Sequence, residues 1–347
     1  MSRTTPPRPV DVTAVFPQLA ALARAATRLH PRPGAPTPHH SSVGGPLLWP
    51  ADEPWPHCTG PHDWDGFNEV LSPDDIRLQR DIRASIAARR ASGTHPPHHT
   101  PEERALEERI STGRPWPEGP VAMLPVAQLF ARDVPLLRAP EDTDADLLQV
   151  LWCAFDHPDH PRTATYWRSS PAISNSLSNP PDPDALQFPG YLPEPCLLIP
   201  EEVTEYPNPL ELSTEDQQQL KDAARWRQAG PGWDDAYAAA ADEFYRNQLS
   251  TSPGWKIGGW TRWSLTDPMP RRCSTCGSDM YPLLTIASLE WGSATTSWIP
   301  IEDQATAAPS PYSRPSNPTL LDLARGYDLQ LHMCPVSAEH PHLELIQ

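Results

Sequence analysis

Residues 44–56 read GGPLLWPADEPWP, and residues 258–270 read GGWTRWSLTDPMP. A single offset of 214 positions (258 − 44) aligns both glycines, Trp49 with Trp263, one acidic residue with another, and two prolines. Tryptophan and paired glycines are infrequent, so this match is hard to obtain by chance even in a chain rich in proline. The stretch therefore predicts an internal repeat, and an internal repeat determines which fold should be expected for the whole chain.

Two further blocks repeat. Residues 123–129 align with residues 280–286 at an offset of 157 (280 − 123), and residues 148–153 align with residues 329–334 at an offset of 181 (329 − 148). All four blocks are short and mainly apolar, which is typical of buried strands. Both members of the second pair end in cysteine. We expect two diverged copies of one strand-rich domain.

The changes in offset locate the insertions. The first copy has 57 additional residues (214 − 157), and this insert, at about 69–113, holds helical stretches at about 74–91 and 101–110. The second copy has 24 additional residues (181 − 157). Residues 293–318, rich in Ser, Thr and Pro, account for these and are expected to form a loop.

The predicted organisation has four parts, and strands with segregated helices indicate an α+β fold. An N-terminal helix, at 15–29, and a linker occupy residues 1–39. The first copy follows at 40–180, then a linking strand and helical segment at 181–250, and the second copy at 251–347.

Three local patterns refine this scheme. Residues 214–248 hold two helical stretches interrupted by Gly-Pro-Gly, and Ser213 supplies good capping chemistry. The apolar run at 196–199 predicts a strand. The His- and Pro-rich stretch at 92–101 is the best candidate for disorder.

The charge of the chain limits its partners. The formal net charge is −17, and Lys221 and Lys256 are the two lysines in a chain with no basic stripe or tail. The electrostatic signature of a nucleic-acid-binding protein is therefore absent, and an acidic surface is repelled by anionic membranes. A basic protein partner would suit such a surface. No apolar run is long enough to span a bilayer and no secretory signal is found, so we expect a cytoplasmic protein.

The six cysteines are expected to be thiols or metal ligands, because a chain without an export signal seldom forms disulfides. Cys273 and Cys276 form a Cys-x-x-Cys pair followed by glycine, a spacing at which both thiolates can point at one zinc ion. The repeat alignment supplies the rest of a closed structural site in the second copy: Cys273, Cys276, Cys334 and His340, with His342 or His332 as substitutes for the last.

The first copy offers a corresponding set. Cys58 and His62 lie near the aligned positions of the Cys-x-x-Cys pair, and Cys153 aligns with Cys334. The predicted zinc ligands of this copy are Cys58, His62, Cys153 and His160, with His157 as the alternative to His160.

Other interpretations of these residues remain open. A Cys-x-x-Cys pair can be a redox couple, and the cysteines could be buried thiols without a metal; Cys196 is expected to be such a thiol. A catalytic zinc is not indicated, because His-Glu-x-x-His is absent and the His342–Glu344 triplet follows the cysteine pair instead of preceding it as in nucleobase deaminases.

No other catalytic motif is found. The Gly-x-Ser-x-Gly elbow, the phosphate-binding loop and the dinucleotide fingerprint are absent. The neighbouring carboxylates Glu201 and Glu202 are interpreted as solvated surface in an acidic chain. The Trp-Pro stretch at 46–56 is expected to pack its own tryptophans and not to form a ligand groove.

The repeated stretches resemble the YwqG-like proteins, a bacterial family of unknown function, and in particular their actinobacterial members. Residues 44–56, 256–263, 273–277 and 195–207 carry the resemblance, which covers about 40–347. The resemblance implies a duplicated α+β fold and, for some members, an immunity-like role near secreted-toxin genes. The chain departs from the family at Thr285, where a strand ending in glutamine plus an aliphatic residue is usual.

The sequence thus favours a non-enzymatic, zinc-stabilised protein that binds another protein. One alternative is an enzyme of unrecognised type, a hydrolase or transferase with its site between the copies. A second alternative is a sensor of zinc or of redox state.

Overall fold

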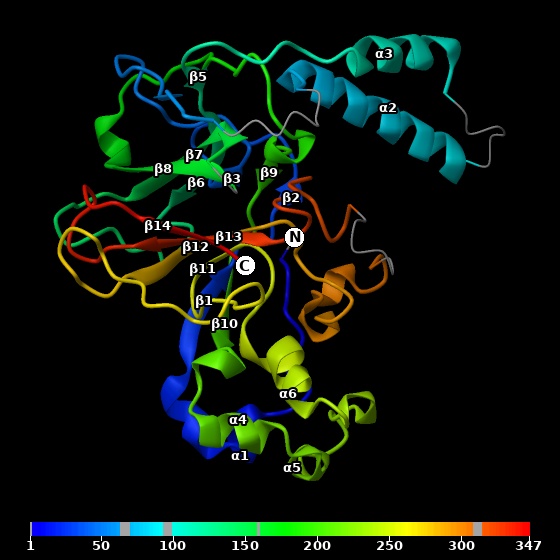
Figure 1. Cartoon of the computed structure of the whole chain (residues 1–347), viewed down its shortest axis with the longest axis vertical. Helices are drawn as coiled ribbons and strands as arrows, with labels where there is room; N and C mark the ends of the chain where they lie inside the picture. Colours follow the sequence, from blue (N-terminus) through cyan, green and yellow to red (C-terminus); the bar gives the residue numbers. More distant parts are fainter. Residues whose placement is uncertain (1, 63–69, 93–98, 158–159, 308–313) are drawn as a thin grey trace.

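The computed structural model describes residues 2–62, 70–92, 99–157, 160–307 and 314–347. Two six-stranded antiparallel sheets lie in the middle of the molecule, and most helices are gathered at its two ends (Figure 1). The predicted α+β class is confirmed.

The first sheet contains strands from residues 32 to 197, and every neighbouring pair is antiparallel. In spatial order it consists of β2 (Arg32–Pro33), β9 (Cys196–Leu197), β3 (Ser42–Val43), β6 (Leu124–Phe130), β7 (Leu147–Asp156) and β8 (Pro161–Arg168). A separate two-stranded ribbon pairs β4 (His57–Cys58) with β5 (Val121–Ala122).

The second sheet is antiparallel throughout as well. Its spatial order is β10 (Glu201–Glu205), β1 (Arg24–Arg28), β11 (Lys256–Gly258), β12 (Tyr281–Ala287), β13 (Asp328–Met333) and β14 (Leu343–Ile346). The strands expected around 123–129, 148–153, 280–286 and 329–334 are confirmed as β6, β7, β12 and β13. The run at 196–199 contains β9, so that prediction also holds.

The two sheets share a local irregularity. The register between β6 and β7 shifts between Pro125 and Ala127, and the register between β12 and β13 shifts between Pro282 and Leu284. These positions are equivalent at the offset of 157 found in the sequence (282 − 125 and 284 − 127). Proline cannot donate a ladder hydrogen bond, and a bulge is one of the few places where a sheet tolerates it.

The paired glycines have a conformational reason. Gly44 and Gly258 have φ values of +62° and +71°, a region that residues with a Cβ rarely adopt. At Gly259 a Cβ would also lie 2.2 Å from Oε2 of Glu205. The chain leaves strands β3 and β11 through these glycines and then places Trp49 and Trp263 in the interior, at 1% and 2% exposure.

Buried glutamines hold the segment after each glycine pair. Gln149 Nε2 donates to the carbonyl of Leu48 at 2.9 Å, and Gln330 Nε2 donates to the carbonyl of Arg262 at 2.8 Å. The backbone N–H of Leu48 is bound by Gln128, at 2.7 Å, whereas Gln330 itself accepts from the N–H of Arg262 at 3.1 Å. In the second sheet, Gln330 alone binds both the N–H and the carbonyl of Arg262. In the first sheet, Gln128 and Gln149 divide the same two contacts at Leu48 between them.

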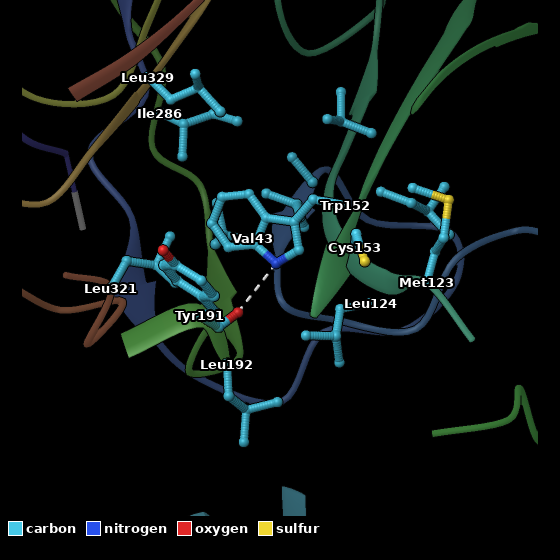
Figure 2. Packing of buried hydrophobic residues seen from close by; sticks show 14 of the residues in the cluster. Val43, Met123, Leu124, Trp152, Cys153, Tyr191, Leu192, Ile286, Leu321 and Leu329 are labelled. Carbon is cyan, nitrogen blue, oxygen red and sulfur yellow. Dashed lines mark hydrogen bonds between the residues drawn. The ribbon is translucent and has the colours of Figure 1, made fainter. Parts of the chain in front are cut away.

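One large apolar core lies between the sheets. Trp152 of β7 is fully buried, and its Nε1 donates to the carbonyl of Tyr191 at 3.0 Å (Figure 2). Ile286 and Leu329 of the second sheet belong to the same cluster. The two sheets thus pack against each other through a common interior, which apolar burial stabilises.

The helical insert is confirmed as α2 (Pro73–Ala91) and α3 (Pro101–Ser111). Both begin at a capping box, with Ser72 and Thr100 as the N-cap residues. Residue 69 of the predicted insert and residues 93–98 of the predicted disordered stretch lie outside the described residues.

A second apolar cluster lies at the opposite end, around Phe16, Trp226 and Phe244. The helical stretch expected at 214–248 consists of α4 (Thr214–Leu220), α5 (Ala223–Gln228), α6 (Ala241–Phe244) and a π-helical turn (Tyr245–Ser250). Ser213 caps α4 as predicted, because its side chain accepts from the N–H of Asp216. Short 3₁₀ turns complete the chain: Pro17–Leu22, Ser170–Ala172, Pro189–Tyr191, Pro209–Glu211, Asp235–Tyr237, Thr296–Trp298 and Ile301–Asp303.

The predicted helix at 15–29 is wrong over most of its length. A short helix α1 (Val12–Val15) and a 3₁₀ turn come first, and residues 24–28 then form strand β1. The backbone of β1 pairs with β10 on one side and β11 on the other, and Ala26 is completely buried between them. These tertiary contacts outweigh the helix propensity of the alanines.

Three smaller expectations complete the comparison. Trp49 and Trp55 pack together with ring centroids 5.2 Å apart, so the packing interpretation of 46–56 is confirmed. The loop at 293–318 contains two 3₁₀ turns, and its residues 308–313 lie outside the described part. Over the ranges that the structure describes, no helix combines the length and the apolar character that crossing a membrane requires.

Candidate metal centres

The predicted second-copy ligands come together at one end of the second sheet. The ligand atoms of Cys273, Cys276, Cys334 and His340 all lie within 4.8 Å of one another. The Sγ atoms of Cys276 and Cys334 are 3.5 Å apart, and Nδ1 of His340 is 3.3 Å from Sγ of Cys334 and 3.5 Å from Sγ of Cys273. The structure places all four residues of this prediction in one group that could hold a metal ion.

The local fold explains the convergence. The N–H of Gly277 donates to the carbonyl of Cys273 at 2.8 Å, and the N–H of Cys273 donates to the carbonyl of Ser278 at 2.9 Å. Gly277 has a φ of +74°, which closes the turn between the cysteines. Cys334 directly follows β13, and the chain then turns back to bring His340 to the same point.

The spacing matches the geometry of zinc. A tetrahedral site has Zn–S bonds of about 2.3 Å and Zn–N bonds of about 2.0 Å, so neighbouring ligand atoms lie about 3.3–3.8 Å apart. The three separations given above, from 3.3 to 3.5 Å, fall within this range. A Cys₃His set with four protein ligands is the closed, structural type of zinc site.

The thiols of this group differ in their surroundings. Cys276 is exposed, and hydrogen bonding with the side chain and backbone of Ser278 lowers its pKa to about 6. Burial raises the pKa of the Cys334 thiol. A bound cation would favour the thiolate form of both, because a coordinating thiol is deprotonated.

A second group of potential metal ligands lies beside the first sheet. The ligand atoms of Cys58, His62, Cys153 and His157 also lie within 4.8 Å of one another. Sγ of Cys58 is 3.4 Å from Nε2 of His157, and the rings of His62 and His157 are 5.0 Å apart. Cys58 comes from the β4–β5 ribbon and Cys153 from β7, so the group joins the ribbon to the sheet.

His160 is not part of this group, which corrects the preferred prediction for the first copy. β7 continues to Asp156, three residues beyond Cys153, and His157 then begins a turn in which its N–H donates to the carbonyl of His160 at 2.9 Å. Nδ1 of His160 lies 3.8 Å from Oε2 of Glu344. The alternative residue, His157, takes the fourth position.

Burial governs the ionisation of the first group. Burial, together with the neighbouring Cys58, raises the pKa of the Cys153 thiol well above its usual range. Burial and the nearby Arg162 lower the pKa of His62, which favours the neutral imidazole that metals bind. Two buried thiols beside two imidazoles form a donor set suited to zinc.

The other predicted candidates have different roles. His332 is fully buried with Nε2 3.0 Å from Oγ1 of Thr261, and burial and Arg271 lower its pKa to about 3. His342 lies with Nε2 2.6 Å from Oγ1 of Thr163. Neither substitute joins the metal group. The expectation for Cys196 is confirmed, since it is a buried free thiol.

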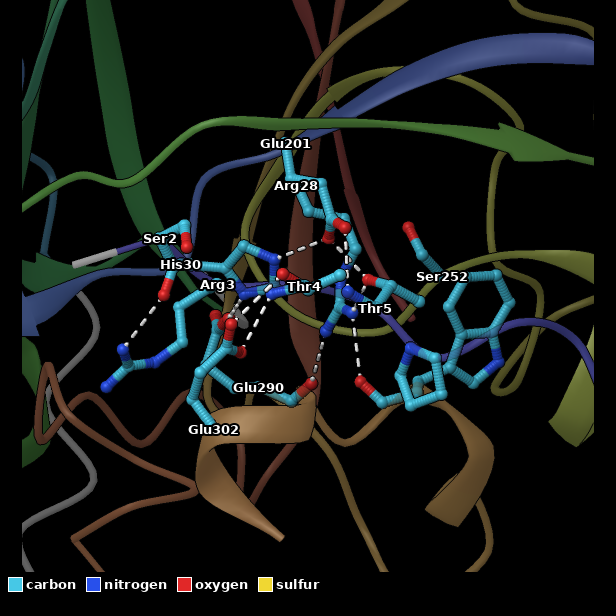
Figure 3. A network of polar contacts seen from close by, with 12 residues as sticks. Ser2, Arg3, Thr4, Thr5, Arg28, His30, Glu201, Ser252, Glu290 and Glu302 are labelled. Atoms are coloured by element: carbon cyan, nitrogen blue, oxygen red, sulfur yellow. Dashed lines mark hydrogen bonds and ion pairs between the residues drawn. The ribbon is translucent and has the colours of Figure 1, made fainter.

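Sequence analysis missed a buried polar network beside β1 (Figure 3). Nε2 of His30 is 3.0 Å from Oε2 of Glu201, and Nδ1 of His30 is 3.6 Å from Oε2 of Glu290. Arg28, fully buried, donates to Oγ1 of Thr5 at 2.7 Å. These residues are far apart in the chain and form no motif, so no short stretch of the sequence identifies them.

The interpretation of Glu201 and Glu202 as solvated surface is therefore wrong for one of them. Glu202 is exposed, but Glu201 is half-buried and also accepts from the N–H of Thr5 at 2.7 Å. The two carboxylates occupy successive positions of β10 and point to opposite faces of the sheet.

Comparisons with known proteins add no relative. Neither the models of protein families nor the curated proteins contain a match to this chain.

Proposed function

We propose that the protein is a non-enzymatic binding protein in which two structural zinc ions stabilise the ends of the two sheets. The observation that carries this proposal is the pair of four-residue Cys/His groups, each compact enough to surround one ion. Four protein ligands complete a tetrahedral zinc and leave no open position for a substrate or a water. This closed arrangement favours a structural role over a hydrolase or transferase.

We further propose that the two halves are diverged copies of one domain and that the resemblance to the YwqG-like proteins reflects ancestry. The equivalent bulges, glycine pairs and glutamine contacts support the duplication. The net charge of −17 supports a basic protein as the partner, because a strongly acidic surface accelerates association with an opposite charge. A basic toxin domain, as in an immunity protein, is one partner of this chemistry.

Metal analysis tests the zinc proposal. Zinc per chain would be measured on protein purified without a His tag, alongside Cys276→Ser and Cys153→Ser. We expect about two zinc ions in the unmodified protein and about one in each variant. A preparation that contains no metal would refute the proposal, and the cysteines would then be core thiols or a redox pair.

Partner binding needs a separate test. Immobilised holoprotein would be incubated with host extract at low and at high salt. A basic protein retained at low salt and released at high salt is the expected result, since screening weakens exposed charge pairs. Recovery of nothing above a matched acidic control protein would contradict partner binding.

A sensor of metal or redox state is the second candidate, because Cys276 is exposed while the three other ligands of its group are at least half-buried. Chelation separates the two roles. A structural ion makes the protein lose local fold when it is removed, whereas a sensor keeps its fold and changes only its binding.

A further inference from the structure

A large cavity lies between the helical insert and residues 314–325, and none of its lining residues belongs to either metal group. Its volume is about 1060 Å³. One wall is a face of α2, a second is the turn Pro189–Tyr191, and a third is the segment that begins at residue 314, drawn in orange to red in Figure 1. The size is that of a pocket for a small organic molecule.

The walls of the cavity are fastened to one another. The guanidinium group of Arg80 donates to the carbonyl of Leu192 at 2.6 Å and to that of Pro189 at 3.2 Å, and it pairs with Glu194 at 3.3 Å. The N–H of Asp322 donates to the carbonyl of Gly190 at 3.1 Å. The cavity is therefore built from segments that hold each other in place.

Its charge is opposite to that of the whole chain. Four arginines line it, although the chain has a net charge of −17: Arg80, Arg83, Arg314 and Arg325. Across the part of the chain that the structure describes, Arg83 and Arg325 have no hydrogen bond or ion pair. Asp156 and Asp322 also line the cavity, but Oδ1 of Asp156 already accepts from the hydroxyl of Tyr191 at 2.6 Å.

The backbone of one wall is strained. Leu320, Ala324 and Arg325 have φ values of +53°, +46° and +69°, and His30 is the one other non-glycine residue with positive φ among those described. All three line this cavity. Such conformations are unfavourable for residues with a Cβ, and they gather where a protein binds a ligand.

We propose that this cavity binds a small phosphorylated organic molecule. Arg83 and Arg325, which come from different walls, are free to bind the phosphate oxygens, and arginine matches phosphate with paired N–H donors. A phosphate is favoured over a single carboxylate because it carries more than one negative charge. Phe188 and the small Ala84 and Ala87 of α2 also line the cavity, and they provide apolar surface and room for a planar ring. The site is independent of the metal groups.

Calorimetric titration of the full-length, metal-loaded protein tests the proposal with three probes: ADP, pyrophosphate and adenosine. We expect ADP to bind with one-to-one stoichiometry, pyrophosphate to bind more weakly, and adenosine not to bind. The double variant Arg83→Gln/Arg325→Gln should weaken ADP binding about tenfold or more, because hydrogen bonds to charged groups are lost. Both arginines are exposed, so the variant should fold, and circular dichroism would verify it.

Arg90→Gln is the matched control, since Arg90 is an exposed arginine of α2 that does not line the cavity. It should leave ADP binding unchanged. Equal binding of ADP by the double variant would overturn the proposal, as would the absence of binding by both ADP and pyrophosphate at millimolar concentration. Pyrophosphate binding as tight as that of ADP would overturn the role of the ring, and adenosine binding as tight as that of ADP would overturn the role of the charge.

Discussion

The two metal groups take their ligands from aligned stretches of the sequence but have different surroundings. Cys58 and Cys153 belong to the large core that both sheets share. Cys273 and Cys334 belong to a small separate cluster with Met280, against which Leu343 packs. The first group would stay assembled through apolar packing when no ion is bound. The second has little apolar support and should depend on its ion.

The interiors differ as well. The second sheet buries an ion pair in which Nζ of Lys256 is 2.7 Å from Oε1 of Glu205, and both side chains are at most 1% exposed. In the first sheet the residue aligned with Lys256 is the buried Ser42 (256 − 214), which pairs with the neutral Gln128. The second sheet thus adds a buried charge pair to the apolar packing that both sheets share, so the second half should respond more strongly to metal and to pH.

Removal of metal should give the largest effect. We expect chelation to destabilise residues 271–280 and 334–341 by several kcal/mol, because structural zinc contributes about 10–16 kcal/mol in small zinc domains. Hydrogen exchange of the backbone amides would measure this. Residues 57–62 and 153–157 should change much less. Equal loss of protection in both regions would remove the difference between the two halves.

Substitution of His157, the proposed fourth ligand of the first group, should have the next largest effect. His157→Ala should lower the zinc content by about one ion per chain and cost about 2 kcal/mol or more, since loss of a metal is among the more damaging single changes. His160→Ala is the control and should keep both ions. Metal analysis with denaturant unfolding would decide, and loss of an ion in the control alone would reverse the assignment.

The equivalent tryptophans allow a matched test of the cores. Trp49 Nε1 donates to the carbonyl of Glu53 at 3.2 Å, whereas Trp263 Nε1 is buried and lacks a partner within the described ranges. Phenylalanine would remove similar volume from both sites but a hydrogen bond from only one. Trp49→Phe should therefore be more destabilising than Trp263→Phe by about 1 kcal/mol in urea unfolding. The opposite order would show that ring packing, and not the hydrogen bond, distinguishes the sites.

We expect the smallest effect for the dependence of stability on pH, through the carboxyl group of Glu201. Burial opposes ionisation of this carboxyl, but hydrogen bonds from His30 and Thr5 outweigh it and lower the pKa from 4.5 to about 2. A lowered carboxyl pKa stabilises the fold above the unfolded value, and this stability is lost as the pH falls from about 4.5 to about 2. Because the group is partly exposed, we expect about 1–2 kcal/mol.

Glu201→Gln should lower the free energy of unfolding at neutral pH and flatten its dependence on pH in that window. Glu202→Gln, on the exposed face of β10, is the control and should change neither. Identical pH profiles for Glu201→Gln and the unmodified protein would contradict a contribution of this carboxylate.

The features that the sequence predicts correctly depend on residues close together in the chain. The repeat offsets located four central strands and the insert, because apolar periodicity and capping residues act over short stretches. Cys273 and Cys276 were recognised because their geometry depends on a four-residue turn. His157 was ranked below His160 because the choice depends on how far β7 extends beyond Cys153, which the spacing does not reveal.

Long-range contacts account for the other errors. The sequence of β1 contains two alanines and two arginines, all good helix formers, and becomes a strand only because β10 and β11 flank it. The sequence predicts Glu201 to be a solvated surface residue because its partners His30 and Thr5 are more than 170 residues earlier in the chain. No pattern within a short window contains these contacts.

The position of β1 between β10 and β11 has a consequence for synthesis. Ala26 pairs with Gly258, so once β1 is made, 232 further residues (258 − 26) must be synthesised before its neighbour β11 exists. Contacts so distant in the chain slow folding, and the ribosome delivers the first half well before the second half can close. A fragment starting near residue 181 would lack β1 and leave β10 and β11 with unpaired edges, which invite aggregation. We therefore expect that the two halves would not be stable as separate products.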